Sequence, residues 1–156
     1  MLNDCCVLLH KPLISGSTIG LEGQLTVYNH NGSPCYRCLH PNPAACQSGS
    51  ENGILGVVPG VVGCLQALEV IKVATRIGEP LCGRMIHFDA LSSRFKTVKK
   101  INQRSSTCTV CGDHPSLTKD DFMMFDYDSF AESLNSSKPA PSPNPLPSNA
   151  RITCRE

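Results

Sequence analysis

Two pairs of cysteines have the spacing of metal ligands. Cys35 and Cys38 are separated by two residues, and Cys108 and Cys111 are separated in the same way. In a tight turn both sulfurs of such a pair can face one ion, and four thiolates complete the closed tetrahedral geometry of a structural Zn²⁺ site. Because four thiolates leave no open position for water, the pattern predicts a structural zinc site and not a catalytic one.

Two other kinds of chemistry use paired cysteines. A redox-active dithiol normally stands at the start of a helix in a βαβ unit, whereas Pro34 precedes the first pair and Pro41 and Pro43 follow it. We therefore expect no helix to start there. Structural disulfides belong to secreted proteins, and the residues after Met1 have neither the basic segment nor the long apolar segment of a secretory signal. Metal binding is the favoured interpretation.

The bulk composition narrows the class of protein. The chain has 156 residues, enough for one domain and a tail. Its net charge of +1 gives no field that attracts nucleic acid, so we expect no direct nucleic-acid partner. We find no uninterrupted apolar run of about eighteen residues and expect no membrane span. Ten cysteines without a secretory signal predict a reducing compartment, which we take to be the cytoplasm.

Several stretches have the patterns of strands that would position the cysteines. Residues 11–16 predict a short buried strand that ends at a glycine, and residues 22–29 alternate like a half-buried strand. Residues 84–89 and 95–101 predict an antiparallel hairpin that leads to the second cysteine pair. The lysines of its second strand predict a solvated edge, although this basic face could also bind phosphate.

The clearest helix pattern starts at Pro59. Apolar residues recur from there at intervals of three and four until the stop signals Gly78 and Pro80. So little charge lies among them that we expect the helix to be packed on most sides, in a core or against a second subunit. Cys64 on this helix is expected to be a small buried hydrophobic residue.

The loop before this helix carries one more thiol, Cys46. Prolines and glycines punctuate residues 39–53, and spacing alone favours an incidental surface cysteine. The alternative is a nucleophile on an exposed loop, because reactive cysteines need exposure. Neither a G-x-G-x-x-G turn nor a P-loop occurs in the chain, so the sequence contains no recognisable phosphate cradle.

The composition changes after the second cysteine pair. Residues 118–134 are acidic and aromatic, which predicts a short helix or a segment docked on the domain. Five prolines fall between positions 139 and 147, which predicts a disordered, extended linker. We therefore divide the chain into a domain at 1–117, the acidic and aromatic segment at 118–134 and a linker at 135–156.

Six stretches of this sequence together resemble a known family. They are KPLISG at 11–16, EGQLTVY at 22–28, PCYRC at 34–38, GILGVVPG at 53–60, GCLQALE at 63–69 and the Cys108 pair. The series closely resembles the MoeB/ThiF family of ubiquitin-activating-like adenylyltransferases. Within that family it is most similar to the eukaryotic adenylyltransferase and sulfurtransferase proteins of molybdenum cofactor synthesis and tRNA thiolation, and the resemblance covers nearly the whole chain.

The resemblance implies a fold and an activity. The fold is α/β, the C-terminal half of a Rossmann-type adenylation domain whose zinc ligands are Cys35, Cys38, Cys108 and Cys111. The activity is the adenylation, with ATP and Mg²⁺, of the C-terminal glycine of a ubiquitin-like sulfur carrier. This leads to a thiocarboxylate that serves molybdenum cofactor synthesis and the 2-thiolation of wobble uridine in tRNA. The implied partner is the sulfur-carrier protein, and the implied assembly is a homodimer.

The chain departs from the family pattern in three ways. The nucleotide loop, arginine finger and metal-binding aspartate lie upstream in the family, and a rhodanese domain with its cysteine lies downstream. We expect a chain truncated at both ends in this way to be inactive alone and to associate through exposed apolar faces. The family's adenylation-domain cysteine corresponds to Gly49, and Cys46 on the same loop is the candidate catalytic replacement. The competing interpretation is a non-catalytic, zinc-bound half-domain that docks the carrier or dimerises through the helix at 60–76.

Overall fold

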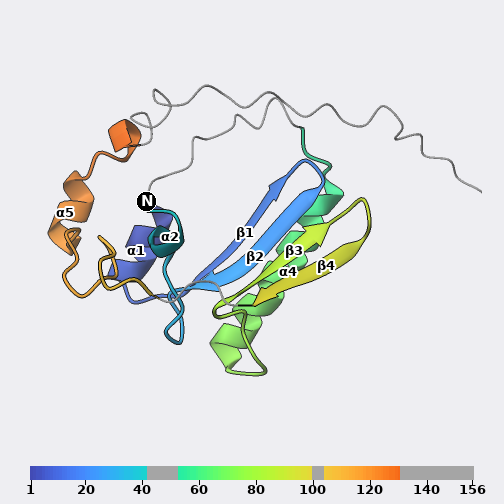
Figure 1. Ribbon diagram of the computed structural model, residues 1–156, viewed down its shortest axis with the longest axis horizontal. Helices are drawn as coiled ribbons and strands as arrows, with labels where there is room; N and C mark the ends of the chain where they lie inside the picture. Colours follow the sequence, from blue (N-terminus) through green and yellow to red (C-terminus); the bar gives the residue numbers. More distant parts are fainter. Residues whose placement is uncertain (42–52, 100–103, 131–156) are drawn as a thin grey trace, which may run out of the picture.

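The computed structural model describes residues 1–41, 53–99 and 104–130. In these residues a four-stranded antiparallel sheet, in the order β1-β2-β3-β4, meets a group of short helices at one end (Figure 1). The strands are β1 (Leu13–Ile19), β2 (Glu22–Tyr28), β3 (Arg84–Asp89) and β4 (Arg94–Lys99). The helices are α1 (Leu2–Leu8), α2 (Tyr36–Leu39), α4 (Val57–Thr75) and α5 (Lys119–Met124).

The sheet confirms the predicted hairpin and corrects the first strand. β3 and β4 pair antiparallel, and β4 lies at the edge of the sheet as predicted. β1 continues past Gly16 to Ile19, so the prediction that the glycine ends this strand is wrong. Gly16 stands opposite Leu25 inside the ladder instead. β2 is more buried than predicted, because Thr26 and Tyr28 on its second face are also covered.

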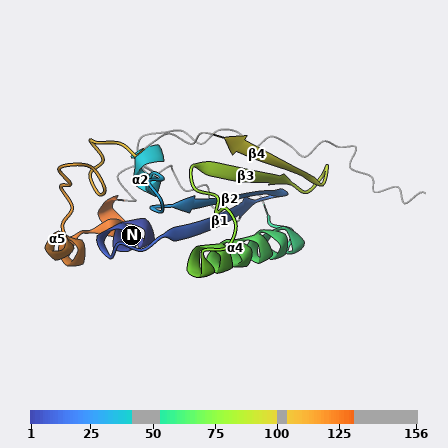
Figure 2. The same ribbon diagram turned by 90° about the horizontal axis from the view of Figure 1, so that it is seen from below.

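Helix α4 lies along one face of the sheet (Figure 2). Val58 and Val62 on its inner side are buried together with Phe88 of β3. Leu65, further along the helix, packs against the buried Leu25 and Val27 of β2. Apolar side chains of the helix and two central strands therefore form the core of this region, because burying them together removes them from water.

Two glycines allow α4 to approach the sheet closely. A Cβ atom placed on Gly23 would lie 2.5 Å from Cγ2 of Val62, and one on Gly16 would lie 2.9 Å from Cγ1 of the same side chain. Contacts this short would force the helix or the strands to move. Gln66 adds a polar contact here, because its Nε2 donates to the carbonyl oxygen of Ile14 at 2.8 Å. The absence of side chains at these two positions thus fixes the distance between helix and sheet.

The outer side of α4 is exposed. Only Val58, Val62 and Glu69 are buried along the helix, whereas Leu68 and Ile71 expose 50% and 55% of their surface. The prediction that the helix is packed on most sides is therefore wrong for the described residues. Cys64 is exposed rather than buried for the same reason. A helix on one sheet needs a single apolar stripe, and the apolar residues on its other sides have no described neighbour to cover them.

A buried charge fixes the end of α4. Glu69 is 3% exposed, forms an ion pair with Lys72, and accepts a hydrogen bond from the backbone N–H of Leu81 at 2.8 Å. The helix ends at Thr75, because Arg76 adopts a left-handed conformation with φ 59°. The predicted stop at Gly78 therefore comes slightly late, and Gly78 serves the following turn with φ 66°.

By length and composition α4 is also apolar enough to cross a membrane. The helix contains no uninterrupted apolar run of that length, because Gln66, Glu69 and Lys72 interrupt its sequence. One such helix is weak support for a span, since a buried core helix of a soluble protein passes the same test; in this helix 17% of the apolar window is buried. Here the buried stripe of the helix packs on β1 and β2 and contains the ion-paired Glu69.

Candidate metal centre

The structure brings the four predicted cysteines together. The Sγ atoms of Cys35, Cys38, Cys108 and Cys111 all lie within 4.8 Å of one another. The Sγ–Sγ distances are 3.7 Å for Cys35–Cys38, 3.7 Å for Cys35–Cys108 and 3.3 Å for Cys38–Cys111. A tetrahedral zinc with Zn–S bonds of about 2.3 Å holds its sulfurs about 3.8 Å apart. The cluster therefore has the donor set and the size of a four-thiolate metal site.

The first cysteine pair is presented by one helical turn. Cys35 is the N-cap of α2, and the backbone N–H of Cys38 donates to its carbonyl oxygen at 3.1 Å. The prediction that no helix starts here is wrong, because Pro34 precedes the N-cap and no helical hydrogen bond is needed there. The helix ends at Leu39. It follows β2, whose neighbours in the sheet are antiparallel, so it is not the crossover helix of a βαβ redox unit.

The second pair stands in a turn that requires a glycine. The N–H of Gly112 donates to the carbonyl oxygen of Cys108 at 2.9 Å and closes the turn. A Cβ atom on Gly112 would lie 2.6 Å from the carbonyl oxygen of Ser106. The two turns also touch directly, because the N–H of Ser105 donates to the Sγ of Cys38 at 3.4 Å. Backbone groups thus orient both turns toward a common centre.

An apolar shell surrounds the sulfurs. Cys35 and Cys108 are buried in one cluster with Val7 of α1, Val110 and Leu117. The partly buried Cys38, Cys111 and Phe125 pack against the rim of this cluster. Such a shell limits the access of water to a metal and lowers the local dielectric constant.

The cysteine thiols also shift one another's pKa. The contact with the Cys111 thiol is the largest cause that lowers the pKa of Cys35 to about 5, against the opposing effect of burial. The same contact with Cys35 raises the pKa of Cys111, and burial raises it further. The close contacts thus favour a thiolate within the cluster, and a thiolate is the form in which sulfur binds a metal.

A buried ion pair, which the sequence patterns did not reveal, supports the first turn. Arg37 stands between the two cysteines and donates through Nε and Nη2 to both carboxylate oxygens of Asp4, with a shortest distance of 2.6 Å. Asp4 is 1% exposed. Burial alone would raise the pKa of Asp4, but hydrogen bonds from Arg37, Asn3 and Tyr127 lower it. A carboxylate inside an apolar stretch and an arginine between two ligands were the signals available in the sequence.

The remaining predictions concern the loop and the C-terminal part of the chain. Cys46 and Gly49 lie outside the described residues, so the catalytic role considered for Cys46 stays a prediction. The same holds for the linker at 135–156. The predicted short helix after residue 117 is confirmed as α5, where Thr118 and Asp121 form a reciprocal capping box.

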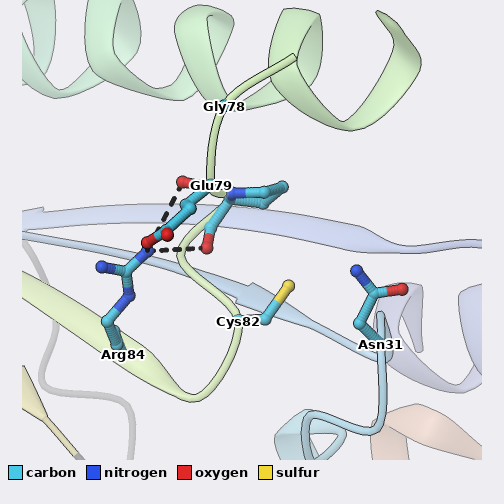
Figure 3. A pocket seen from close by; sticks show the side chains of 6 residues that line it. Asn31, Gly78, Glu79, Cys82 and Arg84 are labelled. Atoms are coloured by element: carbon cyan, nitrogen blue, oxygen red, sulfur yellow. Dashed lines mark hydrogen bonds and ion pairs between the residues drawn. The ribbon is translucent and has the colours of Figure 1, made fainter. Parts of the chain in front are cut away.

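A separate pocket of about 570 Å³ lies beside the C-terminal end of α4 (Figure 3). Its one cationic side chain is already engaged: the Arg84 guanidinium donates to the carbonyl oxygens of Glu79 and Pro80 at 3.4 and 3.0 Å. Burial raises the pKa of Cys82, so its thiol is not activated as a nucleophile. This pocket therefore offers no reactive group comparable with the cysteine cluster.

Comparison with known proteins decides the family. The sequence pattern of the ThiF family matches residues 1–110. The chain belongs to the ThiF family. This membership confirms the family resemblance, and with it the α/β adenylation-domain fold expected from the sequence.

Members of the ThiF family among curated proteins are similar over long stretches. A rice protein, "Adenylyltransferase and sulfurtransferase MOCS3", is 63% identical over 160 residues, which cover 100% of this chain and 36% of that protein. The protein of the same name from Arabidopsis thaliana is 58% identical and is covered to 33%. The mouse protein is 42% identical over 141 residues, which cover 88% of this chain and 30% of the mouse chain. This chain thus spans a minor part of the relatives it matches.

Solved structures agree with the ThiF fold. The crystal structure of E. coli MccB superposes with a TM-score of 0.57 and 20% sequence identity, covering 73% of this chain and 36% of MccB. A structure of MccB with ATP gives a TM-score of 0.55 at 21% identity. At this level of identity the likeness concerns the fold alone.

Proposed function

We propose that this chain serves in ThiF-type activation of a ubiquitin-like sulfur-carrier protein. In this reaction the C-terminal glycine of the carrier is adenylated with ATP and Mg²⁺ and then converted to a thiocarboxylate for molybdenum cofactor synthesis and tRNA wobble-uridine 2-thiolation. The ThiF match over residues 1–110, together with the four-cysteine cluster, carries the proposal. The rice, Arabidopsis and mouse relatives are named adenylyltransferase and sulfurtransferase, which supports both the adenylation step and the sulfur-transfer step.

The chemistry explains why activation is needed. A carboxylate is a poor electrophile, because its negative charge repels nucleophiles. When its oxygen attacks the α-phosphorus of ATP, the bond to pyrophosphate breaks and an acyl-adenylate forms. A sulfur nucleophile can then attack the acyl carbon and displace AMP. The described residues contain no glycine-rich turn between a strand and a helix that could cradle phosphates, so we assign no step of adenylation to them.

The role that we assign to this chain is structural. Cys35, Cys38, Cys108 and Cys111 would hold one Zn²⁺, which supplies a rigid tetrahedral crosslink and leaves no position for a reacting water. The two cysteine turns are 73 residues apart in the sequence, so the ion would join the N-terminal elements to residues 104–130. The free thiols favour a reducing compartment, and we propose the cytoplasm.

A graft into a longer relative tests this proposal. The chain would replace the residues it matches in the rice MOCS3 protein, and carrier-dependent exchange of pyrophosphate into ATP would be measured. We expect exchange in the graft, loss of exchange with Cys108→Ser, and no exchange with the 156-residue chain alone. A folded, metal-containing graft without exchange would overturn the proposal.

A second function is favoured by the exposed side of α4. Leu68, Val70 and Ile71 leave an apolar surface on this helix uncovered among the described residues. The chain could therefore act without catalysis, as a metal-bound half-domain that docks the carrier or dimerises through α4. The two functions differ in one observable. The first gives pyrophosphate exchange in the graft, whereas the second gives a carrier complex or a dimer without pyrophosphate exchange.

A further inference from the structure

We propose that Arg37 couples the metal site to the C-terminal segment at residues 125–130, so that metal binding fastens this segment onto α1. The inference rests on the proposed four-cysteine metal site and adds a mechanical role to it. The helices α1, α2 and α5 gather at one end of the sheet in both views (Figures 1 and 2). Two segments from the first 40 residues and one from the end of the described chain therefore meet beside the cysteine cluster.

The position of Arg37 depends on the first cysteine turn. Arg37 lies between Cys35 and Cys38 in α2, so its backbone is held by the same turn that aims the two sulfurs. A second contact fixes this turn against α1, because the backbone N–H of Tyr36 donates to Oδ1 of Asn3 at 2.8 Å. A tetrahedral ion would lock Cys35 and Cys38 in this geometry and would hold the arginine between them in place.

The charged group of Arg37 is held by Asp4. Its Nε and Nη2 bind the carboxylate of Asp4, and Nδ2 of Asn3 donates to the same carboxylate at 2.9 Å. The side chain of Asp4 is 1% exposed and that of Arg37 is 12% exposed. A buried carboxylate that loses such a partner keeps its desolvation penalty, so movement of Arg37 is strongly disfavoured while the pair is intact.

The 125–130 segment closes over this ion pair. The hydroxyl of Tyr127 donates to Oδ2 of Asp4 at 3.0 Å, across 123 residues of sequence. The guanidinium carbon of Arg37 lies 4.6 Å from the centre of the Phe130 ring and 5.8 Å from that of Phe125. An arginine at these distances from aromatic faces is attracted to them, and more strongly where water is excluded.

The contacts of residues 125–130 with the rest of the protein require the Cys35–Cys38 turn to be held in one conformation. Phe125 packs on the apolar cluster that contains Cys35 and Cys108, while Phe130 and Tyr127 contact the Arg37–Asp4 pair. Without metal, no bond would hold the four sulfurs at these distances, which should loosen both turns. Loss of the metal should therefore release residues 125–130. In the sequence these residues are followed by the last part of the acidic and aromatic segment and then by the proline-rich stretch at 135–156.

Hydrogen exchange with mass spectrometry tests this coupling in the 156-residue chain. The chain is loaded with Zn²⁺ or Cd²⁺, and exchange is followed in peptides covering 35–38 and 125–130, before and after chelation. We expect chelation to speed exchange at 125–130 by roughly tenfold or more, alongside faster exchange at 35–38. The absorbance of Cd²⁺–thiolate bonds reports metal binding independently of any activity.

Three variants separate coupling from general loosening. Arg37→Lys keeps the charge but loses the two-nitrogen contact and the stacking, and Tyr127→Phe removes one hydrogen bond. Both should bind one metal and show fast exchange at 125–130 even when loaded. Arg104→Gln is the matched control: Arg104 supports the second turn by donating to the carbonyl oxygen of Cys111 at 2.7 Å, without a contact to residues 125–130. It should keep the segment protected.

The outcomes distinguish failure of the metal site from failure of the inference. If the chain shows no Cd²⁺–thiolate absorbance, the proposed metal site is wrong and the coupling falls with it. If metal binds but exchange at 125–130 is the same before and after chelation, the metal site stands and the coupling is overturned. Unchanged protection in loaded Arg37→Lys would overturn the role of Arg37 in the same way.

Discussion

Two regions of the molecule differ in what surrounds their buried groups. The cysteine end, which comprises α1, α2 and residues 104–130, buries a charged group and a sulfur, with Asp4 and Cys35 each 1% exposed, while Leu2 and Met124 on its short helices stay open at 66% and 87%. The sheet region, which comprises β1–β4 and α4, leaves large apolar side chains open, with Val57 66% and Ile71 55% exposed. A surface of this kind on a soluble protein usually marks a contact with another chain or segment.

The difference reflects what holds each region together. At the cysteine end, contacts between distant segments are specific and charged, as in the Arg37–Asp4 ion pair and the hydrogen bond that Tyr127 donates to Asp4. In the sheet region, one apolar stripe of α4 meets one face of the sheet and the outer side of the helix has no described neighbour. The cysteine end is therefore held by polar contacts between distant segments, and the sheet region has a continuous apolar helix face that a partner could cover.

The largest effect is expected from a substitution that removes the metal. It should loosen the cysteine end and leave the sheet region folded. Cys108→Ser should abolish the binding of one zinc per chain, because a serine hydroxyl replaces one of the four thiolate ligands. Zinc binding of this kind contributes about 10–16 kcal/mol in small zinc-binding peptides. Elemental analysis gives the zinc content, and limited proteolysis shows whether residues 104–130 are released while the sheet persists. Cys64→Ser, at an exposed position on α4, should retain the metal. A full equivalent of zinc in Cys108→Ser would contradict the four-thiolate site.

A smaller effect of the same kind is expected at the buried ion pair. Asp4→Ala should lower the free energy of unfolding by about 3–5 kcal/mol, because Arg37 would lose its buried partner. Urea denaturation of the zinc-loaded chain measures the change. Asp128→Ala, which removes an exposed carboxylate in the same end of the molecule, should change this free energy by no more than about 0.5 kcal/mol. Equal effects of the two substitutions would refute the role assigned to Asp4.

Glycine substitutions sharpen the comparison between the two sides of α4. Gly23→Ala should destabilise the protein by about 1–3 kcal/mol, because the added methyl group would overlap Val62. Gly60→Ala should stabilise it by up to about 1 kcal/mol, because alanine favours helices and a Cβ there meets no atom within 4 Å. Thermal unfolding compares the two variants. Destabilisation by Gly60→Ala would mean that another chain covers this side of the helix in solution.

The smallest expected effect on stability is at the exposed apolar surface. Ile71→Lys should change the free energy of unfolding by no more than about 0.5 kcal/mol, because the side chain is exposed. It should nevertheless reduce self-association of the chain, which sedimentation velocity measures at increasing concentration. Lys72→Ile, which breaks the ion pair with Glu69, should instead lower stability without reducing association. A wild-type chain that stays monomeric throughout would refute association through α4.

Local patterns in the sequence determined much of the architecture. The alternation in residues 22–29 predicted β2, and the short link after residue 89 predicted the β3–β4 hairpin, because both features depend on neighbours close in the chain. The spacing of Cys35, Cys38, Cys108 and Cys111 predicted the composition of the metal centre, because ligand type and spacing are written directly in the sequence. The family followed from the same motifs and was confirmed over residues 1–110.

The tertiary structure alone decided which surfaces are covered and which distant side chains meet. The exposure of Cys64 and the outer side of α4 depends on what packs against the helix, and an apolar pattern gives no indication of that. The contact of Tyr127 with Asp4 joins residues 123 positions apart, and no local periodicity encodes such a pair. Desolvation and long-range hydrogen bonds act through the folded geometry, so these features could be found only once the chain was folded.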